Sequence, residues 1–324
     1  MYSIQQLQSI IVETIDGKKY PAEPAELYQP MQYMMNLGGK RLRPALLLMG
    51  CDAFGGDIHQ AINPAIAIEV FHNFTLMHDD IMDKAPLRRG KTTVHEKWNS
   101  SVGILSGDAM LVEGYKLMMQ VSEKVLRPVL EIFNDTAIAV CEGQQLDMNF
   151  ETQATVNISS YINMIRLKTA VVLGGALKIG ALIAGANQQD ADLIYTFGED
   201  LGIAFQLQDD ILDVYGDPEK FGKQVGGDII SNKKTYLLIK ALETANAEQS
   251  AELNYWLQLA NFDTVKKVSA VRTLFDKMEI REKAEQEMNH YTQNALQSLK
   301  DLPIKEVQKS QLFEFADMLL IREN

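Results

Sequence analysis

The sequence predicts an all-α protein with one domain over residues 1–324. Apolar residues recur at helical spacing along almost the whole chain. Nine prolines and 21 glycines are too few for a sandwich of short strands with a turn every ten residues or so. There is also no β-type alternation longer than a few residues, and no linker, repeat or low-complexity tract interrupts the pattern.

The expected helices follow one another with short stops between them. Gly38-Gly39 ends the second helix, and Pro44 is tolerated in the first turn of the third. A loop is expected at 86–90 and an irregular stretch at 216–233. The expected helices are residues 3–16, 23–37, a helix from about 42, 57–84, 102–123, 128–151, 157–186 and 188–215, followed by four more that end near 321. Helices of 25 to 30 residues span roughly 40 Å, which is long enough to wall a deep cavity.

Composition excludes several classes of protein. The net charge of −12 argues against a nucleic-acid partner. The longest apolar run, 170–186, contains Lys178 and falls short of the roughly 20 residues of a membrane span. The two cysteines, Cys51 and Cys141, allow neither a disulfide framework nor a cysteine zinc site, so we expect a reducing cytoplasm. An acidic chain can bind an anionic substrate only through metals or a local basic cluster.

Two Asp-Asp-x-x-Asp motifs are the decisive feature. They are Asp79-Asp80-Ile81-Met82-Asp83 and Asp209-Asp210-Ile211-Leu212-Asp213, each late in a long apolar helix. Residues i and i+4 share a helix face, so the outer carboxylates of each motif point the same way. A single motif could be a solvated helix end, but two copies with identical spacing favour compensation by a cation. Clustered carboxylates suit Mg²⁺, which retains water and shares substrate phosphates.

Basic residues accompany these acids in short structured contexts. Lys40 and Arg43 stand three apart at a helix start, where free backbone amides also favour anions. Each basic residue taken alone reads as a surface charge, but together they provide cations for two diphosphate groups. The others are Arg88-Arg89 just after the first acidic motif, Lys168 before Thr169 in an apolar helix, Lys223 after Gly222, and Lys233-Lys234.

These motifs, in this order, resemble the trans-isoprenyl diphosphate synthases, the family of farnesyl, geranylgeranyl and longer polyprenyl diphosphate synthases. The resemblance covers 38–44, 72–90, Gly143-Gln144 with Asp147, Lys168-Thr169, and 205–235. It implies an α-bundle around a large central cavity, usually a homodimer. It also implies three magnesium ions in each active site.

The resemblance assigns a role to each matching residue. The magnesium ligands would be Asp79, Asp80, Asp83, Asp209, Asp210 and Asp213. Arg88, Lys168 and Lys223 would contact the allylic diphosphate, and Thr169 and Gln206 would lie beside the reacting carbon. Lys40, Arg43, His72 and Arg89 would bind the diphosphate of isopentenyl diphosphate, and Lys233 would close over the head group.

The implied activity is head-to-tail condensation of isopentenyl diphosphate with dimethylallyl, geranyl or farnesyl diphosphate. Such a reaction needs no Ser, Cys or His nucleophile, and the sequence offers no plausible triad. Phe74, five residues before Asp79, with small Thr75 beside it and Phe71 a turn deeper, resembles the chain-length floor of archaeal-type geranylgeranyl synthases. This predicts a C20 product, with C15 as the alternative.

Two other classes stay open. A class I terpene cyclase also ionises allylic diphosphates on an α-bundle, but it usually carries a different second metal motif and has no use for a second diphosphate site. The regulatory subunit of a heteromeric synthase usually has degraded acidic motifs, whereas both motifs here are intact.

Overall fold

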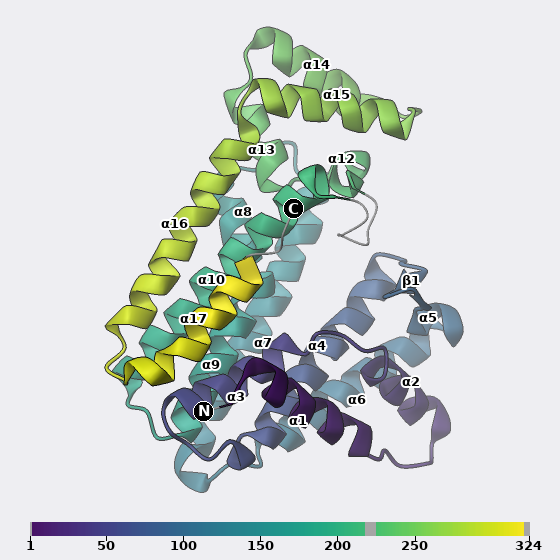
Figure 1. Ribbon diagram of the computed structural model, residues 1–324. Helices are drawn as coiled ribbons and strands as arrows, with labels where there is room; N and C mark the ends of the chain where they lie inside the picture. Colours follow the sequence, from purple (N-terminus) through teal and green to yellow (C-terminus); the bar gives the residue numbers. More distant parts are fainter. Residues whose placement is uncertain (1, 218–224, 321–324) are drawn as a thin grey trace. The chain divides into compact units, whose positions relative to one another are not determined.

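The computed structural model describes residues 2–217 and 225–320. Helices dominate it, which confirms the predicted all-α class (Figure 1). The strands in the described residues are β1 (Leu87–Arg88) and β2 (Lys91–Thr92), which pair antiparallel as one short hairpin. No described helix is long and apolar enough to cross a membrane.

The chain divides into two compact units, each made of three segments. Unit 1 comprises residues 1–134, 175–195 and 303–312, and unit 2 comprises 135–174, 196–302 and 313–324. One boundary, between residues 302 and 303, lies just before α17 (Glu306–Leu320). The other boundaries fall inside α17 and the long helices α7 (Glu123–Thr152), α9 (Val171–Ile183) and α10 (Gln188–Tyr215). A single domain over residues 1–324 stays a prediction.

Unit 1 is built around α4 (Ile62–Met82), whose residues from Pro64 to Phe71 are all buried. The elements around α4 in sequence are α1 (Ile4–Gly17), α2 (Ala25–Met35), α3 (Leu42–Ala53), the short 3₁₀ turn η1 (Ile58–Gln60), α5 (Val94–Lys97) and α6 (Ser100–Met118). Helix α1 begins with a capping box between Ser3 and Gln6, and buries Leu7 and Ile11 on one face.

The predicted helix 57–84 is two elements in the structure, since Asp57 caps the 3₁₀ turn and α4 starts only at Ile62.

Unit 2 contains the second half of the chain's helices. They are α8 (Ile158–Ile165), η2 (Arg166–Ala170), α12 (Gly227–Ser231), α13 (Tyr236–Thr244), α14 (Ala247–Gln258), α15 (Thr264–Lys277) and α16 (Ile280–Asp301), with parts of α7, α9, α10 and α17. Between residue 233 and the last described residue, 320, there are five helices where four were predicted, because Asn246 starts a new capping box and separates α13 from α14. Figure 1 shows α14 and α15 side by side.

The predicted regular helix 157–186 is interrupted. Residues Arg166–Ala170 form a π-helix, η2, between α8 and α9. A π-turn is a wide, rare turn that is found frequently at functional sites. It carries Lys168 and Thr169, two of the predicted site residues.

Candidate active site

The first acidic motif ends α4 in unit 1. Asp79 and Asp80 lie in the last turn and Asp83 is the C-cap, with its N–H donating to the Asp79 carbonyl at 2.9 Å. Asp83 is exposed, Asp79 is half-buried and Asp80 is only 2% exposed. The motif therefore offers carboxylates to solvent at its two ends and keeps the middle one inside.

Arg88 compensates the buried Asp80. Its Nε lies 2.8 and 2.9 Å from the two Asp80 carboxylate oxygens, and its Nη2 lies 2.7 Å from Oδ1. The same Nη2 is 3.6 Å from Asp79 Oδ2. A fork-shaped contact of this kind holds a carboxylate in a fixed orientation.

Arg89, the next residue, serves a different part of unit 1. It lies with Gly90 in the two-residue turn between β1 and β2, and both have positive φ, 53° and 73°. This pairing is the type I′ geometry that matches hairpin twist. The guanidinium of Arg89 donates to the Gly38 carbonyl and rests on Gly39, where an added Cβ would lie 2.9 Å from Arg89 Cζ. Only glycine leaves that space open.

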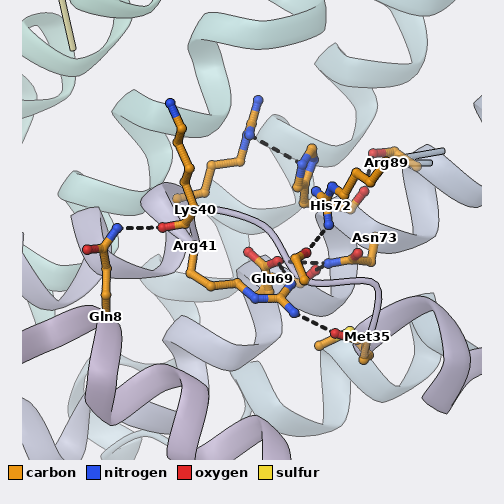
Figure 2. A network of polar contacts seen from close by, with 11 residues as sticks. Gln8, Met35, Lys40, Arg41, Glu69, His72, Asn73 and Arg89 are labelled. Atoms are coloured by element: carbon orange, nitrogen blue, oxygen red, sulfur yellow. Dashed lines mark hydrogen bonds and ion pairs between the residues drawn. The ribbon is translucent and has the colours of Figure 1, made fainter. Parts of the chain in front are cut away.

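Lys40, Arg43, His72 and Arg89 all belong to unit 1. Figure 2 labels Lys40, His72 and Arg89. Nη1 of Arg43 lies 3.3 Å from Nε2 of His72. Burial lowers the pKa of His72 well below its usual value, and the positive charge of Arg43 lowers it further. A neutral imidazole beside arginines suits a hydrogen-bonding role toward an anion.

The second acidic motif lies in the last turns of α10 in unit 2. Asp210 is buried, and its Oδ2 accepts hydrogen bonds from the Tyr161 hydroxyl and from the Tyr236 N–H at 3.3 Å. Burial raises the pKa of Asp210 to about 7, although the Tyr161 hydrogen bond acts in the opposite direction. Its role as a metal ligand stays a prediction. Asp209 and Asp213 are half-buried, and Asp213 Oδ1 accepts from the Asp228 N–H at 2.9 Å.

Lys168 and Thr169 stand on the π-turn between two helices of unit 2. Two glycines leave room for the π-turn. A Cβ added at Gly143 of α7 would lie 2.7 Å from Lys168 Cα, and one added at Gly202 of α10 would lie 2.6 Å from Ala170 Cα. Nζ of Lys168 donates to Asp147 Oδ2 at 2.6 Å. Gln206, one turn beyond Gly202, donates to Asp210 Oδ1 at 3.4 Å.

The segment after α10 carries the remaining lysines. Lys223 lies outside the described residues. Lys233 is exposed just after Asn232, whose φ is 55°. Lys234 instead donates to the carbonyls of Phe150 and Gln153 at the end of α7, where a cation is favourable.

The predicted chain-length residues lie on α4, one to two turns before Asp79. Phe71 and Phe74 are buried with ring centroids 5.8 Å apart, and Phe74 packs edge-on against His78 at 4.8 Å. The hydroxyl of Thr75 donates to the His72 carbonyl at 2.8 Å, as expected for a helical threonine. Their role in product length stays a prediction.

Comparison with known proteins identifies the family. The polyprenyl synthetase family model matches residues 24–275, which is well over half of the chain. The chain belongs to the polyprenyl synthetase family. It is 40% identical to a geranylgeranyl diphosphate synthase of Sulfolobus acidocaldarius over 251 residues, 76% of this chain and 74% of that one. The predicted resemblance is thereby confirmed.

Solved structures agree. A crystal structure of a geranylgeranyl pyrophosphate synthase is 45% identical, with a TM-score of 0.95 and full coverage of both chains. Another, from Corynebacterium glutamicum and complexed with isoprenyl diphosphate and magnesium, is 27% identical with a TM-score of 0.85, covering 99% of this chain and 98% of that one. The all-α fold of this polyprenyl synthetase is therefore that of known prenyl synthases.

The donor set of this polyprenyl synthetase fits magnesium. Its two motifs present only carboxylate oxygens, and Asp83, Asp79, Asp209 and Asp213 are at least partly accessible. Among the described residues, no group of three or more His, Cys, Asp or Glu side chains forms a ready-made metal cage. Mg²⁺ usually takes one or two protein carboxylates and completes its octahedron with water and substrate phosphate. Two open carboxylate groups suit that manner of binding.

Sequence reasoning missed several residues that hold the site together. Arg41 and Glu69 form a buried ion pair in unit 1, and Tyr161 holds Asp210 in unit 2. The sequence pattern could have revealed the role of Glu69. It is a lone acid in the apolar run of α4, and a buried charge needs a partner. The sequence offers no sign of the role of Tyr161, because it is 49 residues away from Asp210 and a tyrosine is an ordinary residue on the buried face of a helix.

Proposed function

We propose that this polyprenyl synthetase is a geranylgeranyl diphosphate synthase. It condenses isopentenyl diphosphate head-to-tail with dimethylallyl, geranyl and farnesyl diphosphates, and its product is the C20 diphosphate. The identity to geranylgeranyl synthases supports the reaction class and the product.

One observation carries the proposal of two substrates. The consecutive arginines Arg88 and Arg89 serve different groups: Arg88 binds the acidic motif and Arg89 binds the Gly38-Gly39 loop. An enzyme that ionises one diphosphate needs only the first group. A second cluster, with Lys40, Arg43 and His72, suits an enzyme that also binds a second diphosphate.

In this proposal the carboxylates of the two acidic motifs would hold three magnesium ions in each active site. These ions would supply positive charge to the leaving pyrophosphate of the allylic substrate. Arg88, Lys168 and Lys223 add positive charge to the same group as the allylic carbon–oxygen bond breaks. The double bond of isopentenyl diphosphate then attacks the allylic carbon. The departing pyrophosphate accepts the proton that is lost, so no protein base is assigned.

Replacing the two arginines one at a time tests the division of labour. Arg88→Ala should mainly raise the KM for the allylic substrate and lower kcat, because Asp80 loses its partner. Arg89→Ala should mainly raise the KM for isopentenyl diphosphate, by about tenfold, the loss expected for one charge-assisted hydrogen bond. Steady-state kinetics with each substrate varied in turn gives both constants.

The control for this pair is Lys91→Ala in the same hairpin, where the side chain is exposed. It should leave both KM values within twofold of the wild type. If Arg88→Ala and Arg89→Ala shift the same constants in the same way, the division between them is wrong.

Phe74 is the proposed floor for the growing chain. Phe74→Ala should lengthen the product beyond C20, because the ring at position 74 is removed while Asp79 is untouched. Chromatography of dephosphorylated products measures the lengths. The matched control is Phe133→Ala, another buried phenylalanine, which contacts the Phe71 ring at 5.5 Å. If the wild-type enzyme makes products longer than C25, or if only Phe133→Ala lengthens the product, Phe74 does not limit chain length.

A product assay with labelled isopentenyl diphosphate and allylic primers of increasing length tests the whole proposal. A C20 diphosphate supports geranylgeranyl synthase, and a C15 diphosphate supports farnesyl synthase instead. Hydrocarbon formed from an allylic diphosphate without isopentenyl diphosphate would indicate a terpene cyclase. No product at all would indicate a regulatory subunit.

Homodimer formation and a cytoplasmic location complete the proposal. Leu105, Val112 and Met119 are exposed on α6 and its C-cap at spacings of seven residues, which suits packing against a second copy. Light scattering should give twice the chain mass of 36.3 kDa. The proposed cytoplasmic location rests on cysteine usage, since two cysteines, Cys51 and Cys141, cannot build a disulfide framework.

A further inference from the structure

Arg41 differs from the two basic residues beside it. Lys40 is exposed and Arg43 is half-buried, but Arg41 is only 7% exposed. Its backbone is left-handed, with φ 49°, at the N-cap of α3. That conformation is uncommon for a residue with a side chain. Figure 2 shows Lys40 and Arg41 leaving the chain in opposite directions.

The turned-in guanidinium ties three segments of unit 1 together. Nη1 of Arg41 donates to Glu69 Oε1 on α4, and Nη2 donates to the carbonyl of Met35, the last residue of α2. The side chains of Arg41 and Glu69 are 5% and 3% exposed. Glu69 also accepts from Asn73 Nδ2 at 2.9 Å, one helical turn further along α4. The pair thus joins the Gly38–Arg41 loop to the helix that carries His72.

The loop that Arg41 fixes also supports other members of the basic cluster. Arg89 donates to the Gly38 carbonyl and lies against Gly39, and the Lys40 carbonyl accepts from Gln8 Nε2 at 2.5 Å. On the helix side, His72 stands three residues after Glu69 and contacts Arg43. The Arg41–Glu69 pair therefore connects two parts of the basic cluster. One is the loop that contains Lys40 and contacts Arg89, and the other is the helix that carries His72.

The charges around Arg41 and Glu69 also connect this pair to the basic cluster. Arg43, Arg88 and Arg89 all lower the pKa of His72, so cationic groups crowd this part of unit 1. Burial lowers the pKa of Arg89, and the Glu69 carboxylate counteracts that effect. A buried carboxylate that is already paired with Arg41 can balance the positive charge of the cluster without competing with an incoming anion for the other cationic donors.

We propose that Arg41 and Glu69 are positioning residues for the diphosphate of isopentenyl diphosphate. They do not touch the substrate; they set the spacing between the donors on the Gly38–Arg41 loop and those on α4. Binding a diphosphate with several donors at once depends on their being arranged in advance. This inference rests on the proposed function and assigns to it two residues that sequence reasoning had left without a role.

The test uses variants that keep charge or shape. Arg41→Lys keeps the positive charge but loses the fork that reaches both Glu69 and Met35. It should raise the KM for isopentenyl diphosphate about tenfold, with kcat and the allylic KM within twofold of the wild type. Glu69→Gln keeps the side-chain shape and should raise the same KM. Arg127→Lys, at a surface pair whose arginine is 90% exposed, is the matched control and should change nothing.

Combination with a ligand variant separates positioning from general stability. In a Lys40→Ala background, Arg41→Lys should raise the KM by a smaller factor than it does alone, because the two residues act through one loop. Equal factors in both backgrounds would overturn the inference. So would a folded Arg41→Lys enzyme with unchanged KM, or with equal changes for both substrates.

The outcomes also separate this inference from the proposed function. A wild-type protein that elongates allylic diphosphates while Arg41→Lys behaves normally overturns the positioning role alone. A wild-type protein that forms no elongated product overturns the proposed function and the inference with it. Thermal melting of each variant shows which of them are folded.

Discussion

Asp79→Ala and Asp209→Ala are each expected to lower turnover by roughly a thousandfold or more. Metal-assisted charge stabilisation contributes several kcal/mol to such a transition state, and about 1.4 kcal/mol corresponds to a tenfold change in rate. Both side chains are only half-buried, so their removal should leave the helices folded. Turnover at saturating magnesium and both substrates measures the first effect, and circular dichroism measures the second.

Asp317→Ala is the control for these variants, since this acid is exposed on α17. It should retain wild-type turnover. Near-normal activity in Asp79→Ala or in Asp209→Ala would contradict the role of both motifs. Asp210→Ala is a different experiment, because Asp210 is buried against Tyr161 and its loss should also lower the melting temperature.

Gly143→Ala is expected to destabilise unit 2 and to lower turnover roughly a hundredfold. Alanine favours a helix over glycine by about 1 kcal/mol, so the change would stabilise α7 if space were free. Here the new methyl group would lie 2.7 Å from Lys168 Cα and 2.8 Å from the Leu167 carbonyl carbon. Overpacking typically costs about 1–3 kcal/mol, and backbone atoms cannot move aside as a flexible side chain can. The cost of overpacking should therefore exceed the gain in helix propensity.

The loss of activity follows from the same clash. Displacing the π-turn moves Lys168 and Thr169, and a shift of about 1 Å in a positioned group can cost roughly a hundredfold in rate. The control is Gly17→Ala at the end of α1, where an added Cβ meets nothing within 4 Å. Melting temperature and kcat measure the two effects. A Gly143→Ala enzyme with wild-type kcat would show that the close approach to Lys168 does not matter for catalysis.

The acidic motifs and the helices that carry them could be predicted from the sequence, because spacing on a helix follows directly from its period. The hairpin that separates Arg88 from Arg89 could not. It depends on a two-residue turn in which Arg89 adopts a positive φ, and only Gly90 gave a sign of that turn. The family resemblance assigned the two arginines to different diphosphates, but the sequence pattern predicted only a loop at 86–90. The structure adds the hairpin that directs the two guanidinium groups to different partners.

The π-turn at Lys168 was also beyond prediction. The residues Arg166–Ala170 contain no proline or glycine to mark a break in the helix. The space for the turn comes from Gly143 and Gly202, which are distant in the sequence. Arg41 illustrates the same limit: one left-handed residue decides which of three neighbouring cations turns inward, and the residue types alone do not reveal it.

The contact between Arg88 and Asp80 has a thermodynamic consequence. A divalent cation that takes Asp80 as a ligand must compete with the guanidinium, whereas a diphosphate that takes Arg88 must compete with the carboxylate. Each ligand releases the group that the other requires, so each should strengthen the binding of the other by one and the same factor. The free protein should therefore hold metal at this motif weakly. A titration should give the same coupling whether magnesium or pyrophosphate is added first.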